Sequence, residues 1–260
     1  MKKVLINPNL CEFPLELRGL LMNTKIYDSS CSEMAKVFFI DKDKGYYLKK
    51  AEVGSLKNEK IMTEYMHEKS MATKVLGYIS DDYDWLLTEK VQGEDCTHSE
   101  YLSNPNRLCD TIANILRELH NTDYSNCPAE SRMTQYVERA IENYSLGNYD
   151  KSAVSKLGFG SADEAYRVIE ENKSLLKCDT LIHGDYCLPN IILDNWKFSG
   201  FIDVDYCGVG DKHIDIYWAV WSLAYNLGTD EYRNRFLDAY GRENFDPEML
   251  RTIAAFEVFG

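Results

Sequence analysis

The segment 181–203, LIHGDYCLPNIILDNWKFSGFID, constrains the fold more than any other stretch of this chain. Its pattern predicts a strand, a tight loop, a second strand, a hairpin and a third strand. His183 and Asp185 follow the first strand. Asn190 opens the second strand, and Asp203 ends the third. Burial of the apolar positions would leave the two aspartates and the asparagine at one rim. A buried β-meander with polar ends is the plainer interpretation, and the regular spacing of the polar groups argues against it.

The polar side chains of this segment are a set of oxygen donors. Two carboxylates and an amide suit a hard cation such as Mg²⁺. An aspartate five residues before the asparagine suits a base that orients a hydroxyl. The H-x-D-x-x-x-x-N spacing and the later aspartate resemble the catalytic loop and metal-binding aspartate of the kinase fold. The His-Gly-Asp form, with Cys-Leu-Pro before the asparagine, resembles the aminoglycoside phosphotransferases of the 3′ type.

Composition limits the class of protein. The chain has 260 residues, 45% of them hydrophobic, which suffices for one large domain or two lobes that share a cleft. No apolar run approaches the ~20 residues that cross a bilayer, and the first ten residues lack the apolar core of a signal peptide. The eight cysteines are scattered without a C-x-x-C pair, which indicates free thiols in a reducing cytoplasm and argues against a zinc site.

Charge is unevenly distributed along the chain. Residues 1–90 carry 14 Lys and Arg against 14 Asp and Glu, whereas residues 91–260 carry 15 against 28, which is the whole net charge of −13. The acidic second half argues against nucleic acid as a partner. It could steer a cationic small molecule to the protein, or it could serve solubility alone. We expect no membrane partner and a monomer or weak dimer.

The first ninety residues are predicted to form a small, β-rich N-lobe with one helix. Apolar runs at 37–40 and 46–48 flank the sequence DKDKG, which is a hairpin signal. The polar loop 28–32, which contains Ser30, precedes this hairpin. In a kinase-like fold this loop would cover the phosphates of ATP, although it is not a G-x-G-x-x-G loop.

Lys49 and Glu59 are the predicted nucleotide-positioning pair. Lys49 ends the third predicted strand, and segment 55–71 reads as a helix with Glu59 in its first turn. A lysine on the third strand paired with a glutamate on the next helix is the kinase arrangement. Alone, Lys49 would read as a solvated lysine, and Glu52 and Glu64 compete with Glu59. The resemblance assigns Lys49 to the α- and β-phosphates.

A short strand is predicted at 85–88, after a turn at 81–84, and the pattern breaks at 89–93. The resemblance places the hinge between two lobes at this break. Backbone groups of Thr88 to Lys90 would there form hydrogen bonds with adenine. The evidence for this assignment is positional, because backbone contacts leave little trace in a sequence.

The remainder, 91–260, is predicted as a mainly helical C-lobe that carries the catalytic loop, the metal site and an acidic substrate side. Helices are expected at 106–120, 133–143, 161–176, 211–228, 229–241 and from 246 onward. Segment 144–160 looks irregular, either a loop that closes over substrate or a surface connection. Leu-His and Cys-Pro within 119–128 are a second match to the 3′ type, with His120 expected to be structural. Asp215 is assigned by resemblance to support of the catalytic loop, or it is a capping residue.

The resemblance covers essentially the whole chain and implies an α+β, bilobal, protein-kinase-like fold that binds ATP, with GTP possible. It implies that Lys49, held by Glu59, positions phosphates. Asn190 and Asp203 would hold Mg²⁺, and Asp185 would orient the attacking hydroxyl while His183 braces the loop. The implied activity is phosphotransfer to the 3′-hydroxyl of an aminoglycoside, which gives antibiotic resistance.

Departures from the family pattern concern the acceptor. After the metal-binding aspartate, Asp205 and Tyr206 replace the Gly and basic residue of the 3′ type, which is closer to the wider family that includes choline kinases. Trp221 and Tyr225 stand where the 3′ type carries Arg and acidic residues near substrate. They could hold a protonated amine by cation–π contact or belong to the core, and the core is preferred. Glu257 belongs to an acidic-aromatic end, F-E-V-F, which in the family lies near the drug and here carries one extra residue.

Two other functions remain open at this point. One is a kinase of another small, cationic, hydroxylated metabolite, such as an amine alcohol. The other is a nucleotide-binding module without catalysis, which the intact set of lysine, aspartates and asparagine disfavours. A protein kinase is not expected, because the Gly-rich loop and the A-P-E element are missing and the chain between Asp203 and Asp211 leaves no room for an activation segment.

Overall fold

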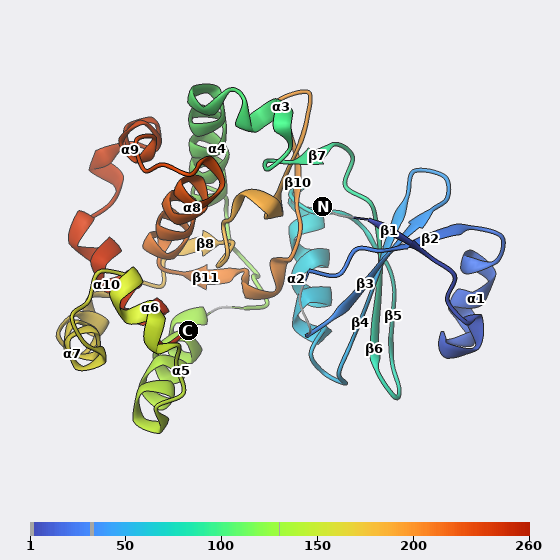
Figure 1. The fold of residues 1–260 in the computed structure, drawn as a ribbon, viewed down its shortest axis with the longest axis horizontal. Helices are drawn as coiled ribbons and strands as arrows, with labels where there is room; N and C mark the ends of the chain where they lie inside the picture. Colours follow the sequence, from blue (N-terminus) through green and yellow to red (C-terminus); the bar gives the residue numbers. More distant parts are fainter. Residues whose placement is uncertain (1–2, 32–33, 130) are drawn as a thin grey trace. The chain divides into compact units, whose positions relative to one another are not determined.

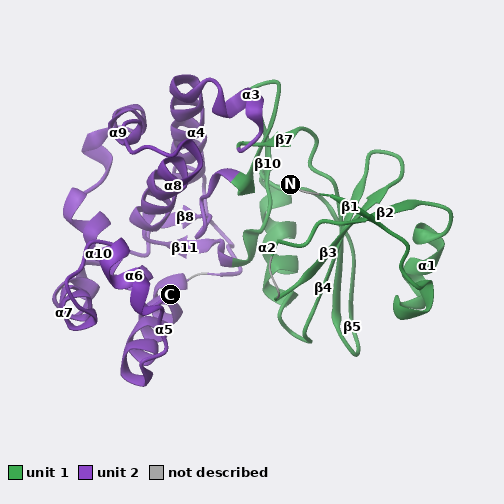
Figure 2. Ribbon diagram, in the orientation of Figure 1, with its two compact units in different colours: residues 1–96, 189–205 green, residues 97–188, 206–260 purple. Residues whose placement is uncertain are grey.

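The computed structural model divides the chain into two compact units. It describes residues 3–31, 34–129 and 131–260. The first unit comprises residues 1–96 and 189–205, and the second comprises residues 97–188 and 206–260 (Figure 2). The first unit therefore includes a late segment of the chain in addition to the N-terminal residues.

In the described part of the chain, an antiparallel six-stranded sheet forms the centre of the first unit, in the order β1-β2-β3-β4-β6-β5 (Figure 1). The strands are β1 (Val4–Ile6), β2 (Lys25–Asp28), β3 (Lys36–Asp41), β4 (Tyr46–Ala51), β5 (Val75–Ser80) and β6 (Asp84–Glu89). The predicted hairpin is confirmed as β3 and β4. Lys49 lies inside β4, which is the fourth strand and not the third, because β1 precedes it in a region whose sequence signals were mixed.

The two faces of this sheet carry different helices. α1 (Leu15–Leu21) packs on the face that buries Leu48. Neighbouring side chains of a strand point to opposite faces, so Lys49 points to the other face. Leu86, which is paired with Lys49 in the sheet, packs there against Leu56 at the start of α2 (Lys57–Glu68). The alternation thus directs Lys49 to the side of the sheet where α2 lies.

A smaller sheet completes the first unit. β7 (Glu94–Asp95) pairs with β9 (Ile191–Asp194), and β9 pairs with β10 (Lys197–Phe201). Gly93 has a φ of +109°, and a Cβ at this position would lie 2.1 Å from the carbonyl oxygen of Leu193. Only a glycine therefore lets the chain pass so close to β9.

Helices dominate the second unit. Those in its described residues are α3 (Ser99–Leu102), α4 (Pro105–His120), α5 (Arg132–Leu146), α6 (Lys151–Lys156), α7 (Ala162–Asn172), α8 (Lys212–Leu227), α9 (Arg233–Tyr240) and α10 (Pro247–Glu257). β8 (Thr180–Ile182) pairs with β11 (Gly208–Gly210), so it belongs to a different sheet from β9 and β10. The mixed α+β class is confirmed. None of the helices within the described ranges is both long and apolar enough to cross a membrane.

The helix ends agree with their sequence signals. Ser161, Asp211 and Asp246 each accept a hydrogen bond from a backbone amide in the first turn of α7, α8 and α10. These side chains bind amides that the helix itself leaves without a partner. Gly228 ends α8 with a φ of +68°, which a glycine adopts without strain.

The prediction that segment 144–160 is irregular is wrong. α5 continues through Leu146, and α6 follows it. Val154 and Phe159 are buried in a core cluster with Ile169 of α7. The apolar residues of α6 are too few to give a helical period, and the burial that stabilises it comes from α7 and α10, which are distant in sequence.

Truncation in this cluster should destabilise the protein. Ile169 is fully buried, so Ile169→Ala should lower the free energy of unfolding by about 2–5 kcal/mol through lost burial and a residual cavity. The matched control is Leu175→Ala, because Leu175 is 58% exposed. Urea unfolding followed by circular dichroism measures both, and equal losses would contradict the assigned core.

Candidate active site

A cavity of about 290 Å³ lies in the first unit. Its lining includes the predicted nucleotide residues Lys49, Glu59, Thr88 and Lys90 and the predicted metal ligand Asp203. Ser29 and Cys31 of the polar loop also line the cavity. The hydroxyl of Ser30 instead accepts a hydrogen bond from the amide of Val37, and Ser32 of this loop lies outside the described residues.

Lys49 is held by two carboxylates at this cavity. Its Nζ lies 2.5 Å from Oε1 of Glu59 and forms a second ion pair with Asp203. Burial acts to lower the pKa of Lys49, but the charges of Asp203 and Glu59 outweigh it and raise the pKa above its usual value. The ammonium is therefore charged at neutral pH and is placed to bind phosphate oxygens.

Asp84 positions the helix that carries Glu59. Its fully buried carboxylate accepts hydrogen bonds from the amide of Leu56, 2.9 Å, and the hydroxyl of Ser80, 2.7 Å. Burial acts to raise the pKa of Asp84. The hydrogen bonds from Ser80 and Leu56, together with one from the backbone of Gly54, outweigh burial and lower the pKa below its usual value. The ionised carboxylate thus binds the chain at the start of α2. The sequence pattern indicates only that Asp84 is part of a turn.

Asn190 and Asp203 both belong to the first unit. The amide of Ile202 donates a hydrogen bond to the carbonyl of Asn190, 3.1 Å, which joins the two segments next to these side chains. Asp203 adopts a φ of +56°, a left-handed conformation that is uncommon outside glycine. A carboxylate and an amide oxygen fit Mg²⁺, which takes few protein ligands and completes its shell with water and phosphate. No cluster of three or more His, Cys, Asp or Glu suited to a metal occurs among the described residues.

Asp205 lies with Asn58 of α2. The side-chain amide of Asn58 donates to the Asp205 carboxylate, 3.0 Å, and to its carbonyl oxygen. The carboxylate that was predicted to face the acceptor is thus engaged by a residue one position before Glu59.

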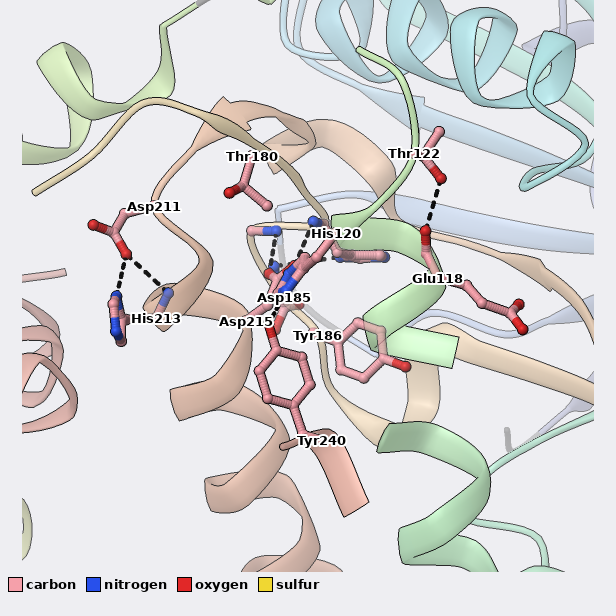
Figure 3. Close-up of polar contacts among 12 residues, drawn as sticks. Glu118, His120, Thr122, Thr180, Asp185, Tyr186, Asp211, His213, Asp215 and Tyr240 are labelled. Atoms are coloured by element: carbon pink, nitrogen blue, oxygen red, sulfur yellow. Dashed lines mark hydrogen bonds and ion pairs between the residues drawn. The ribbon is translucent and has the colours of Figure 1, made fainter. Parts of the chain in front are cut away.

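In the second unit, Asp215 holds the predicted catalytic loop. Its carboxylate is fully buried and accepts hydrogen bonds from the amides of His183 and Gly184, each 2.8 Å. His120 contributes a third contact through Nε2, 3.1 Å (Figure 3). Asp215 is therefore bound to the two residues that precede Asp185, which is the supporting role that the resemblance implied.

The rest of this loop is attached at further points. The amide of Asp185 donates to Nδ1 of His183, 3.3 Å. The buried Tyr186 donates its hydroxyl to the carbonyl of Ile112 on α4, 2.8 Å, and the amide of Leu188 donates to Oγ of Ser222, 2.9 Å. The last two contacts involve α4, which precedes the loop in the sequence, and α8, which follows it. Together these hydrogen bonds fix the backbone that carries the Asp185 carboxylate.

His120 connects Asp215 to α9. Its Nδ1 lies 2.8 Å from the hydroxyl of Tyr240, and its Nε2 faces Asp215. A carboxylate accepts only, so Nε2 carries the hydrogen, and in a neutral ring Nδ1 accepts from the Tyr240 hydroxyl. The expectation that His120 is structural agrees with this arrangement.

Glu257, at the end of α10, is the acidic group of the predicted substrate side. The hydroxyl of Tyr136 donates to its carboxylate, 2.8 Å. Burial, aided by the negative charge of Asp185, raises the pKa of Glu257 to about 7, against the opposing effects of Tyr136 and Arg139. Its charge therefore changes near neutral pH.

The preference for Trp221 and Tyr225 as core residues is wrong. Trp221 is 40% exposed and Tyr225 is 72% exposed. Both belong to α8, which carries apolar residues on all sides. The hydrophobic pattern therefore does not indicate which side of α8 faces solvent. Tyr206 is also exposed, and the guanidinium of Arg139 lies 5.8 Å from its ring centre.

Tyr47 lines the cavity and was missed. Burial, together with the charges of Glu94 and Asp95, raises its pKa to about 12. The signal was present, because Tyr47 lies two residues before Lys49 and so shares its face of β4. The amides of Glu89 and Lys90 already donate to carbonyls of Lys74 and Gly45, so a nucleotide base would need other groups of this segment.

A family model described as the phosphotransferase enzyme family matches residues 32–253. This chain belongs to the phosphotransferase enzyme family. A probable aminoglycoside 3′-phosphotransferase of Lactococcus lactis is 48% identical over 253 residues, which cover 97% of each chain.

Solved structures agree in fold with this phosphotransferase. The crystal structure of an aminoglycoside-3′-phosphotransferase of type VIII has a TM-score of 0.77 and 23% identity, over 94% of this chain and 97% of that one. An aminoglycoside phosphotransferase of Streptomyces rimosus, in complex with ADP and streptomycin, has a TM-score of 0.69 and 20% identity, over 86% and 91%. The predicted kinase-like α+β fold is confirmed.

Loss of the Asp215 charge should destabilise this phosphotransferase. Asp215→Asn keeps the size of the side chain but replaces one accepting oxygen by an NH₂ group, which faces a backbone amide that is itself a donor. We therefore expect the free energy of unfolding to fall by about 3 kcal/mol or more. Tyr240→Phe removes only the hydroxyl contact to His120 and should cost about 1 kcal/mol. Urea titration compares the two, and a smaller effect for Asp215→Asn would refute its central position.

Glu257 should make stability depend on pH. Its pKa is about 7 in the folded state against an ordinary value of 4.5 in the unfolded chain, so the unfolded chain ionises first. Between pH 4.5 and 7 the folded state retains the proton, and the stability contribution of Glu257 falls by about 3 kcal/mol as pH rises. Glu257→Gln should therefore gain stability relative to wild type between pH 5 and pH 8. Glu171→Gln, at an exposed glutamate, is the matched control for the amide substitution itself.

Proposed function

We propose that this chain transfers the γ-phosphoryl group of ATP to the 3′-hydroxyl of an aminoglycoside and thereby gives its host antibiotic resistance. The observation that carries the proposal is Lys49, held between Glu59 and Asp203 at a cavity of the first unit. The named activity of the 48% identical relative supports the choice of acceptor. The ADP and streptomycin bound by the S. rimosus enzyme support ATP as the donor.

The first unit would bind the nucleotide. Lys49 would bind the α- and β-phosphates while Glu59 keeps its ammonium in place. Asn190 and Asp203 would hold Mg²⁺, which when bound neutralises charge that develops on the phosphoryl oxygens. Asp203 would bind the metal ion in place of Lys49, and Lys49 would bind a phosphate in place of Asp203. Each charge would thus keep a partner of opposite sign.

Asp185 would orient the attacking hydroxyl. Its backbone is fixed through His183, Tyr186 and Asp215, so the carboxylate can accept the hydroxyl hydrogen bond without a large loss of entropy. The transition state of phosphoryl transfer is loose, so orientation contributes more than early removal of the proton. His183 acts on the loop and not on the substrate.

The second unit would bind the acceptor. Glu257 offers a carboxylate to an ammonium group, and Tyr206 offers an exposed ring near Arg139. Asp205 would act through Asn58 rather than by direct contact. The scattered cysteines, without a C-x-x-C pair, support a reducing cytoplasm as the compartment. A monomer or weak dimer remains part of the proposal, as does a division of the chain into an N-lobe of residues 1–90 and a C-lobe of residues 91–260.

The test measures ADP release from Mg²⁺–ATP with a panel of acceptors. Kanamycin B and tobramycin differ by the 3′-hydroxyl, which tobramycin lacks, and choline represents the amine alcohols. Turnover with kanamycin B and none with tobramycin would support the proposal. Turnover with choline alone, or equal rates with both antibiotics, would overturn the assigned acceptor, and GTP in place of ATP tests the donor.

Asp185→Ala should separate catalysis from nucleotide binding. We expect kcat to fall by about 10²–10⁴-fold, because the hydroxyl loses its orienting group. The affinity for Mg²⁺–ATP, measured by calorimetry, should stay within about threefold, since the proposed nucleotide ligands belong to the first unit. Asp238→Ala changes an exposed aspartate paired with Arg242 and should retain full turnover. Near wild-type kcat in Asp185→Ala would refute its role.

A further inference from the structure

A buried hydroxyl without a partner lines the cavity of the first unit. Ser29 is 2% exposed, and its Oγ has no hydrogen-bond partner among the residues that the structure describes. A buried hydroxyl that stays unpaired is unfavourable, and native structures pair nearly all such groups. Its place in the cavity wall indicates that a ligand supplies the partner.

The backbone around this hydroxyl is held in place. The amide of Ser29 donates to the carbonyl of Val37, 2.8 Å, and the amide of Val37 donates to Oγ of the next residue, Ser30, 3.0 Å. The amide of Ser30 donates to the carboxylate of Asp28, 2.9 Å. The end of β2 is therefore fixed against β3, and only the side chain of Ser29 remains for a ligand.

Lys3 lies beside Ser29 on the same face of the sheet. β1 pairs with β2 through Val4 and Asp28, and the next pair in this antiparallel register places Lys3 opposite Ser29 (Figure 1). On its other side, Ser29 is connected through β3 to Lys49 on β4. Residues that pair across strands point to one face, and all three of these residues line the cavity.

The ammonium of Lys3 is oriented by aromatic rings. Its Nζ lies 3.4 Å from the ring centre of Phe39 and 5.7 Å from that of Tyr47. A ring face attracts the charge without accepting a directed hydrogen bond from each N–H group. The side chain is thus positioned, while its donors are suited to oxygen atoms of a ligand in the cavity.

The groups around Ser29 suit hydroxyls better than phosphates. Glu94 also lines the cavity, and its charge acts on both Lys3 and Tyr47. A carboxylate repels a phosphate, whose oxygens only accept, whereas each hydroxyl of a ribose both donates and accepts. Ser29 lies two strands from Lys49, about 10 Å along the sheet, so it is separate from the proposed phosphate ligand.

We propose that Ser29 and Lys3 bind the ribose hydroxyls of the nucleotide and so make this enzyme select ribonucleotides over deoxyribonucleotides. The inference rests on the proposed function for ATP as the donor. It goes beyond that function because it assigns the sugar of the nucleotide to residues of β1 and β2, and it adds a selectivity that neither the phosphate ligands nor the base contacts provide.

The experiment measures binding of ATP, 2′-deoxy-ATP and 3′-deoxy-ATP by calorimetry with Mg²⁺ and without an acceptor. We expect the wild type to bind ATP about three- to thirtyfold more tightly than one of the two analogues, because a hydrogen bond is lost. Ser29→Ala should weaken ATP by a similar factor and bring the ratio between ATP and that analogue toward one. Lys3→Met keeps an unbranched side chain against Phe39 and should also reduce the ratio.

Matched controls test whether the effect belongs to these two side chains. Ser55→Ala and Lys25→Met change exposed residues of the first unit outside the cavity lining, and both should keep the preference of the wild type. If Ser29→Ala weakens ATP and both analogues equally, its hydroxyl does not bind the ribose and the inference is overturned. Equal affinity of the wild type for all three nucleotides would overturn it without any variant.

Failure of the proposed function gives a different result. If the wild type binds none of the three nucleotides, the proposed nucleotide site is wrong and the inference falls with it. If the wild type binds ATP and phosphorylates kanamycin B, but neither Ser29→Ala nor Lys3→Met changes the ratio between ATP and its analogues, the proposed function stands. Only the assignment of the ribose is then overturned.

Discussion

The fully buried carboxylate of Asp215 organises the second unit. A buried charge is tolerated only when hydrogen bonds replace its water, and here two backbone amides and His120 supply them. Those donors belong to segments far apart in sequence, so the requirement brings α4, α8 and the loop after β8 together. The site would lose its geometry if this single acceptor were lost, because the loop that carries Asp185 has its first amides bound there.

A second charge, the half-buried ammonium of Lys49, has the corresponding place in the first unit. Its two acidic partners come from α2 and from the end of the β9–β10 hairpin. Asp84 binds the start of α2, and the amide of Phe201 donates to Met71 just after that helix, 2.7 Å. The nucleotide side therefore depends on how α2 is held at both ends, and the catalytic side depends on how a loop is held by α8.

The proposed acceptor side differs from these two because it combines a buried carboxylate with exposed aromatic rings. Glu257 ends a helix whose buried face includes Phe256, while its own carboxylate reaches Tyr136 and Trp218. Burial and the nearby Asp185 leave it poised near neutral pH, so a bound ammonium would favour its ionised form. Together with the exposed rings of Trp221 and Tyr225, this carboxylate gives the second unit a surface suited to a cation with apolar faces.

Sequence by itself determined the elements that local rules govern. Alternation and turn residues identified the β3–β4 hairpin and placed Lys49 in it, helical spacing identified α4, and capping residues such as Asp211 and Asp246 placed helix starts. The H-x-D-x-x-x-x-N spacing predicted the chemistry through its resemblance to the catalytic loop of the kinase fold. The resemblance predicted that Lys49 pairs with Glu59 and that Asp215 supports the catalytic loop, and the structure contains both contacts. Only the tertiary structure decided that Asp203 is the second partner of Lys49 and that α6 is a helix. It alone showed that Trp221 and Tyr225 face solvent. Each of these features depends on contacts between segments that are distant in the sequence. A local pattern does not show which side of an apolar helix, or which of several acidic residues, forms such a contact.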